Sequence, residues 1–233
     1  MQETFPILEF DANPNAIIEP KAQPLTGNPS QRVVLCFFHD VLAKLAKNGT
    51  LETIGALKSE MGENPIYQIK WEGQNLVVCH PGVGAPLAAG FLDELISLGL
   101  NKFIACGGCG VINDKIDAGA VVILTSAVRD EGTTYHYLPP SREVGASPIA
   151  IAALEKTCAH KGMSYRLGKS WTTDAIFRET VLRRAARLAE GCDVVEMEAA
   201  AFFAVAKFRG VAFGQVVYGG DLVVPHGWDY RDW

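Results

Sequence analysis

The stretch N-L-V-V-C-H-P-G-V-G-A-P-L-A-A-G-F-L-D-E-L-I-S-L-G-L-N-K-F-I-A-C, Asn75 to Cys106, decides the fold class of this chain. Its first part, Asn75–His80, is a short apolar run that ends at Pro and Gly, as a buried strand does. Between Pro86 and Leu98, apolar side chains recur at three- and four-residue steps, which is typical of one face of a helix. Lys102–Cys106 is a second short apolar run. Strand, loop, helix and strand in this order predict an α/β fold with a largely parallel sheet.

The same alternation extends to both sides of this stretch. Further strands are predicted at Val33–Phe38, Ile66–Trp71, Ala120–Ala127, Tyr165–Ser170, Val194–Glu196 and Phe213–Tyr218. Further helices are predicted at Asp40–Asn48, Pro148–Lys161, Arg178–Glu190 and Met197–Phe208. We expect one domain over residues 1–233, in which residues 1–31, with several Pro and Asn and little periodicity, form an irregular N-terminal element.

The composition excludes several classes of protein. Apolar residues make up 48% and charged residues 20%, as in a globular domain, and the net charge of −5 argues against a nucleic-acid partner. No apolar run is long enough to cross a membrane, so no membrane partner is expected. The first residues do not resemble a secretory signal, which predicts a cytoplasmic protein whose six cysteines are reduced.

The segment F-I-A-C-G-G-C-G-V, Phe103 to Val111, places two cysteines two residues apart among glycines. A redox pair usually has aromatic and Pro neighbours, and a structural zinc site needs two more ligands that no second pair supplies. We therefore expect no metal, and we interpret the segment as a glycine-rich turn in which the cysteines act as small apolar residues. A redox function stays open as the minor alternative.

Sites in such a sheet lie beyond the carboxyl ends of the strands. The loops expected there are Pro81–Pro86, Gly107–Val111, Thr172–Thr180, Glu196–Glu198 and Gly219–Val223. Two of these loops can bring backbone amides close to an anion, because glycine leaves the backbone accessible; their candidate residues are Gly84, Gly107, Gly108 and Cys109. Tight packing between strand and helix would explain the glycines equally well.

Three carboxylates stand at predicted strand ends. Glu196 and Glu198 flank Met197; a carboxylate there can accept two hydrogen bonds from a vicinal diol, the geometry of ribose, and Met197 can pack against the apolar face of the sugar. Acidic residues at a helix N-terminus are the equal alternative. Asp221 suits a general acid, provided that burial raises its pKa, but it could also cap the next segment.

Taken in order, these loops resemble the nucleoside phosphorylase family, which includes purine nucleoside and uridine phosphorylases and related nucleosidases. The motifs are G-V-G-A-P-L-A-A with E-L-I-S-L-G, F-I-A-C-G-G-C-G, G-A-V-V-I-L-T-S-A-V-R, T-T-D-A-I-F, V-V-E-M-E-A-A-A and G-D-L, within residues 76–223. The resemblance implies a three-layer α/β/α sandwich around a mixed, largely parallel central sheet. It also implies a homo-oligomer, a dimer or larger, and a further C-terminal helix after Trp233.

The resemblance further implies cleavage of a nucleoside's N-glycosidic bond, by phosphorolysis to free base and ribose 1-phosphate, with inorganic phosphate as co-substrate and no other cofactor. Glu198, Met197 and Glu196 would bind the ribose. Ile176, Phe177 and Arg178 fall on the segment that covers the base. Asp221 falls where purine-cleaving members place the acid that protonates the leaving base, which favours a purine.

The chain departs from the family at the phosphate site. Ala105 stands where phosphorolytic members carry an arginine, and C-F-F-H-D, Cys36 to Asp40, replaces their N-terminal G-D-P-x-R loop. Arg129, Arg178 and Arg32 are other candidates to hold phosphate. A hydrolytic nucleosidase and a non-catalytic nucleoside-binding module on the same fold therefore stay open as alternatives.

Overall fold

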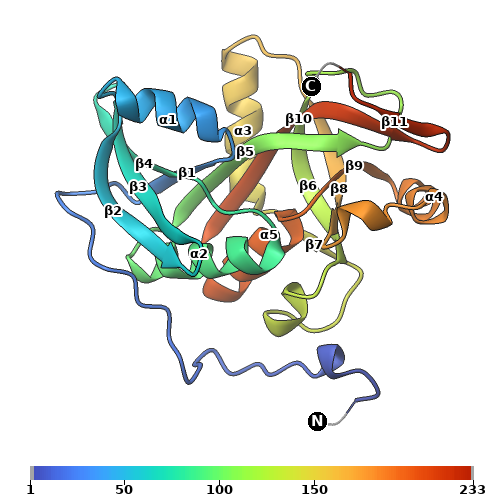
Figure 1. The fold of residues 1–233 in the computed structure, drawn as a ribbon, viewed down its shortest axis with the longest axis horizontal. Helices are drawn as coiled ribbons and strands as arrows, with labels where there is room; N and C mark the ends of the chain where they lie inside the picture. Colours follow the sequence, from blue (N-terminus) through green and yellow to red (C-terminus); the bar gives the residue numbers. More distant parts are fainter. Residues whose placement is uncertain (1–2, 232–233) are drawn as a thin grey trace.

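The structure is a computed structural model that describes residues 3–231, and it is an α/β protein with one mixed sheet (Figure 1). The strands of this part of the chain are β1 (Arg32–Cys36), β2 (Glu52–Ser59), β3 (Gly62–Trp71), β4 (Gln74–Cys79), β5 (Lys102–Val111), β6 (Val121–Asp130), β7 (Glu143–Gly145), β8 (Arg166–Thr173), β9 (Cys192–Glu196), β10 (Ala212–Val224) and β11 (Gly227–Asp229). The α-helices are α1 (His39–Lys47), α2 (Ala85–Ser97), α3 (Pro148–His160), α4 (Val181–Ala189) and α5 (Ala199–Arg209). Short 3₁₀ turns occur at Pro6–Leu8, Thr134–His136 and Ile176–Arg178.

The central strands pair in parallel, in the order β4-β1-β5-β10. Antiparallel β2 and β3 extend the sheet beyond β4. On the other side, β10 pairs with β6, β6 with β8, β8 with β9, and β9 returns to β5. These five strands therefore close into a ring, and Gly110 near the end of β5 lies opposite Val195 near the end of β9.

Helices cover both faces of the sheet, which gives the three layers expected (Figure 1). Val33 and Leu35 of β1 face the main core, which α2 and α5 fill. Cys36, on the opposite face of β1, packs against Leu42 of α1. Because side chains alternate along a strand, one short strand contributes to both cores. Phe202 of α5 stacks on Phe213 of β10, with the ring centroids 4.7 Å apart, and so fixes this helix on the sheet.

The main difference from the sequence-based prediction lies at Gly107–Val111. This segment is not a turn: β5 continues through it to Val111, in register with β10. The glycines fit a strand here because neighbours approach closely; a Cβ on Gly107 would lie 2.9 Å from the Phe37 ring. Other differences are smaller. Strands β2, β7 and β11 were not predicted, α4 begins at Val181 rather than Arg178, and α5 begins at Ala199 rather than Met197.

Residues 3–31 run along the surface with one 3₁₀ turn, Pro6–Leu8 (Figure 1). No helix among the described residues is long and apolar enough to cross a membrane. The C-terminal helix expected after Trp233 lies outside the described residues.

Candidate functional site

A cavity of about 360 Å³ lies at the carboxyl ends of β5, β9 and β10. It collects residues from six separate parts of the chain. Its lining consists of Phe37, Phe38, Val83, Gly108, Cys109, Gly110, Ile176, Glu179, Val195, Glu196, Met197, Glu198, Gln215, Tyr218, Asp221 and Val223. Seven residues predicted from the sequence are among them: Gly108, Cys109, Ile176, Glu196, Met197, Glu198 and Asp221.

Glu198 is 6% exposed and stands at the N-terminus of α5, facing the N-terminus of α2. The backbone N–H of Gly84, which precedes α2, donates to Glu198 Oε1 at 2.6 Å. Burial, together with the neighbouring Glu196 carboxylate, raises the pKa of Glu198 to about 8. Near neutral pH this group therefore exists in both protonation states, and it can accept or donate a hydrogen bond to a sugar hydroxyl.

The loop before α2, which was predicted to bind an anion, binds the Glu198 carboxyl group instead. Gly84 adopts a φ of +86°, and the N–H that was expected to meet phosphate meets a carboxylate of the chain itself. Gly84 does not line the cavity, and neither does Gly107, which packs beneath Phe37. Of the predicted anion-binding residues, only Gly108 and Cys109 reach the cavity.

Glu196 is also buried, but protein groups already satisfy its carboxylate. Ser170 and Thr172 donate their hydroxyls to Oε1 at 2.8 and 2.6 Å, and the backbone N–H groups of Glu198 and Ala199 donate to Oε2 at 2.7 and 2.5 Å. Desolvation raises the pKa of Glu196, and these hydrogen bonds oppose the rise. Glu196 thus joins β8 to the start of α5 and holds the segment that carries Met197 and Glu198.

Asp221 lies on β10 at the rim of the cavity, and its Oδ2 accepts a hydrogen bond from the indole Nε1–H of Trp228 on β11. Strand β11 folds back on β10, with Val223 opposite Trp228, and this pairing brings the indole to the carboxylate. The hydrogen bond thus joins Asp221 to β11.

Two of the predicted base-binding residues do not reach the cavity. Phe177 is 94% exposed, and Arg178 is also exposed, because the 3₁₀ turn Ile176–Arg178 points both side chains outward. Ile176 lines the cavity, as does Glu179, which follows the turn. Glu179 was not predicted as a site residue; burial raises its pKa to about 7, and the charge of Asp221 adds to the rise.

Gln215 was also missed by the sequence reasoning. It is 1% exposed on β10, its side chain lines the cavity, and its Oε1 has no hydrogen-bond partner among the described residues. A buried carbonyl oxygen without a donor is costly, and this makes Gln215 a candidate contact for a bound ligand. In the sequence, a polar residue inside a predicted apolar strand, between Phe213 and Val217, was the signal that could have identified Gln215 as a site residue.

The arginines suggested as phosphate ligands lie elsewhere. Arg129 is buried and donates to Thr134 Oγ1 at 2.9 Å and to the carbonyl oxygen of Pro139 at 2.7 Å. Arg32, at the opposite end of β1, donates to Gln74. Within the described residues, the side chains around the cavity include four carboxyl groups and no Arg, Lys or His.

The two cysteines of the C-x-x-C segment point to opposite faces of β5, because they are three residues apart in a strand. Cys109 donates its thiol to the Tyr218 carbonyl oxygen at 3.2 Å. Cys106 lies opposite Cys36 of β1 in the sheet. The geometry therefore does not let Cys106 and Cys109 join in one disulfide or bind one metal ion.

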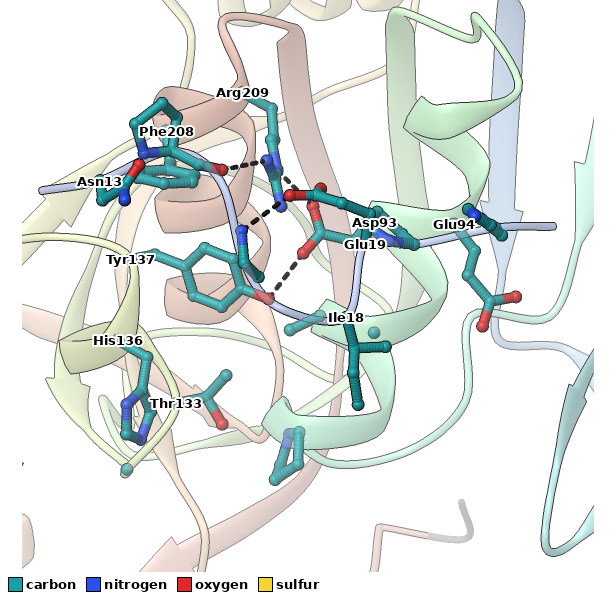
Figure 2. Close-up of a pocket in the computed structure, with 18 of the residues that line it drawn as sticks. Asn13, Ile18, Glu19, Asp93, Glu94, Thr133, His136, Tyr137, Phe208 and Arg209 are labelled. Carbon is teal, nitrogen blue, oxygen red and sulfur yellow. Dashed lines mark hydrogen bonds and ion pairs between the residues drawn. The ribbon is translucent and has the colours of Figure 1, made fainter. Parts of the chain in front are cut away.

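A larger cavity, of about 1080 Å³, lies between the N-terminal segment and helices α2 and α5 (Figure 2). Asp93 sits at its centre, where it accepts hydrogen bonds from the Tyr137 hydroxyl and from Arg209 Nε, both at 2.7 Å. Arg209 also donates to the Pro14 carbonyl oxygen at 3.2 Å, which holds the N-terminal segment over these helices. None of the residues predicted for the site lines this cavity. The smaller, acidic cavity is therefore the candidate site.

Comparison with known proteins finds relatives among the nucleoside phosphorylases. A guanosine phosphorylase from Halorubrum lacusprofundi is 29% identical over 170 residues, which are 72% of this chain and 70% of that protein. A uridine phosphorylase from Haemophilus influenzae is 32% identical over 105 residues, 45% of this chain and 42% of that protein, so less than half of that relative is matched.

Solved structures share the fold. Purine nucleoside phosphorylase from Toxoplasma gondii, in complex with immucillin-H, superposes with a TM-score of 0.72 at 22% identity, covering 83% of this chain and 78% of that chain. AMP nucleosidase from Bacteroides thetaiotaomicron superposes with a TM-score of 0.71 at 22% identity, covering 82% and 80%. The family model described as the phosphorylase superfamily matches residues 31–229, nearly all of the described chain. This chain belongs to the phosphorylase superfamily.

Proposed function

We propose that this protein is an enzyme that cleaves the N-glycosidic bond of a nucleoside, with a purine as the favoured base. The observation that carries the proposal is the convergence of Glu198, Met197 and Asp221 on one cavity, from elements far apart in the sequence. The names of the relatives, guanosine phosphorylase and uridine phosphorylase, support the reaction class.

In the proposed complex, the ribose lies against Met197, and its 2′- and 3′-hydroxyls bind Glu198. The base lies toward Ile176 and Asp221. As the bond to the base breaks, positive charge develops on the sugar, and the ionised carboxylates around the cavity stabilise that charge. Protonation of the base by a carboxylic acid at the Asp221 end assists its departure. Gln215 supplies an unused acceptor for a donor on the ligand.

The nucleophile in the main proposal is inorganic phosphate, which gives the free base and ribose 1-phosphate, as the relatives' names suggest. Hydrolysis is the second candidate, and the cavity lining favours it. Among the described residues, the cavity lining holds four carboxyl groups and no cationic side chain, whereas a phosphate site normally supplies charge-assisted bonds from cationic side chains.

Release of base from adenosine, inosine, guanosine and uridine, with and without phosphate, tests the proposal. Release that depends on phosphate supports phosphorolysis. Release at the same rate without phosphate shows a hydrolytic nucleosidase. Binding of nucleosides without any release, seen as thermal stabilisation, would instead support the non-catalytic binding module.

We also propose that the protein is a cytoplasmic homo-oligomer, a dimer or larger. The six cysteines, Cys36, Cys79, Cys106, Cys109, Cys158 and Cys192, are all free thiols in the structure, as suits a reducing compartment. Sedimentation equilibrium would measure the number of subunits.

A further inference from the structure

Two carboxyl groups in the cavity, Glu179 and Asp221, are 42 positions apart in the sequence but interact electrostatically. Glu179 lies between the 3₁₀ turn Ile176–Arg178 and Thr180, the N-cap residue of α4. Asp221 lies near the end of β10. Both side chains line the same cavity, on the side where Ile176 would meet the base.

The surroundings of the two groups differ. The Asp221 carboxylate accepts a hydrogen bond from the indole N–H of Trp228. The structure shows no hydrogen bond to the Glu179 carboxyl among the described residues, so its oxygens are available to a ligand. Burial and the like charge of Asp221 both disfavour the ionised form of Glu179, so its carboxyl group can hold a proton near neutral pH.

Resting on the proposed function, we propose that Glu179 is the general acid of the reaction and that Asp221, which lines the same cavity and accepts a hydrogen bond from Trp228, keeps Glu179 protonated. The group that hands its proton to the base would then be Glu179. Asp221, the residue predicted as the acid, would act through Glu179 as well as through any contact of its own with the base.

Glu179 gives its proton to the leaving base. As the C1′–N bond breaks, its electron pair moves to the base, and a ring nitrogen of the base takes the proton of Glu179. The oxygen of the nucleophile, water or hydrogen phosphate, forms the new bond to C1′ and loses its proton to the surrounding water. The Glu179 carboxylate then regains a proton from water and is ready for the next cycle.

Other ionisable groups face the same cavity. They are Cys109 on β5, Glu196 and Glu198 around the start of α5, and Tyr218 on β10. Burial keeps the Cys109 thiol neutral, since its pKa lies well above the ordinary value. The pKa of Glu179, about 7, lies below the value of about 8 for Glu198, so loss of the Glu179 proton comes first as the pH rises.

The first experiment compares Glu179→Gln with the wild-type enzyme on two substrates. On inosine, whose base needs protonation, we expect kcat to fall by about 10²- to 10⁴-fold, the usual contribution of a general acid. On 7-methylguanosine, whose base already carries a positive charge, we expect near wild-type kcat. Equal losses on both substrates, or no loss on inosine, would overturn the assignment.

A matched control is Glu94→Gln. Glu94 lies on α2 and lines the other cavity, where Figure 2 shows its carboxylate turned away from the Asp93 cluster. Its pKa is also raised by burial, so the two substitutions remove similar carboxyl groups. We expect Glu94→Gln to retain the wild-type rate on both substrates; a loss equal to that of Glu179→Gln would overturn the assignment.

The second experiment needs no turnover. The ¹³C chemical shift of the Glu179 carboxyl, followed from pH 4 to pH 10, should titrate near pH 7. In Asp221→Asn the midpoint should fall by about one pH unit, because the like charge is removed. A midpoint at the ordinary glutamate value in the wild-type protein, or no change in Asp221→Asn, would refute the pairing. Because this titration does not depend on activity, it decides the pairing even if the wild-type protein releases no base, the result that would refute the proposed function.

Discussion

Replacement of Glu198 by Gln should make the protein more stable and less active. Glu198 is buried beside Glu196, and its pKa is raised from 4.5 to about 8. Between these two values the folded state holds a proton that the unfolded chain has released. The free energy of unfolding therefore decreases as the pH rises from about 4.5 to about 8, and it is independent of this group above that range.

The size of the effect follows from the pKa. A difference of about 3.5 pH units at about 1.4 kcal/mol each corresponds to a cost of about 5 kcal/mol for the buried charge, as an upper bound. Local relaxation and water penetration reduce such costs, so we expect about 3 kcal/mol. Gln carries no charge at any pH, and its amide oxygen can still accept the hydrogen bond from the Gly84 N–H.

Thermal denaturation at pH 5 and pH 9 measures the difference in stability between Glu198→Gln and the wild-type protein. At pH 5 the folded wild-type protein is protonated at Glu198, and the two proteins should melt at similar temperatures. At pH 9 Glu198→Gln should melt higher by roughly 6–12 °C, since 1 kcal/mol shifts the melting temperature of a protein of this size by about 2–4 °C. The exposed Glu52 on β2 provides a control, Glu52→Gln, that should show no such divergence.

The same variant should lose activity, with a higher KM and a lower kcat, because it can no longer bind the sugar hydroxyls as a carboxylate. A gain in stability with a loss of activity is the usual mark of a residue kept for function. A difference in melting temperature that does not change with pH would refute the argument about the buried charge. Equal activity on ribosides and 2′-deoxyribosides in the wild-type enzyme would refute the ribose contact.

Three further changes have clear expected results. Glu196→Ala leaves four donors without their acceptor and should lower the free energy of unfolding by about 3 kcal/mol in urea titrations; a stable variant with impaired binding would instead point to direct ribose contact. Gly108→Ala places a Cβ 3.1 Å from the Tyr218 ring at the cavity and should raise KM with little change in melting temperature; an unchanged KM would contradict a ligand there. The double variant Cys106→Ser, Cys109→Ser should keep its activity under reducing and oxidising conditions, as should the wild-type protein. A wild-type activity that changes between these conditions, and that stops changing in the double variant, would restore the redox alternative.

Local patterns predicted the elements near the site well. The strand and helix between Asn75 and Leu98 occupy nearly the predicted residues, because alternation, helical periodicity and the Pro and Gly at the boundaries are properties of short segments. The prediction for the C-G-G-C-G segment was wrong because it, too, rested on a short local pattern. Its composition is typical of a turn, but pairing with β10, far away in the sequence, keeps it in a strand.

The sequence by itself determined the order of strands and helices, the fold class and the loops that carry Glu198, Met197 and Asp221, since all of these depend on residue type and spacing. The tertiary structure decided what each acidic group does. Only in the folded structure does Glu196 accept hydrogen bonds from four donors and Glu198 accept one from the Gly84 amide. Only there does the charge of Asp221 raise the pKa of Glu179. The protonation and hydrogen bonding of a carboxyl group depend on burial and on neighbours within a few ångströms, and folding brings those neighbours from distant parts of the chain.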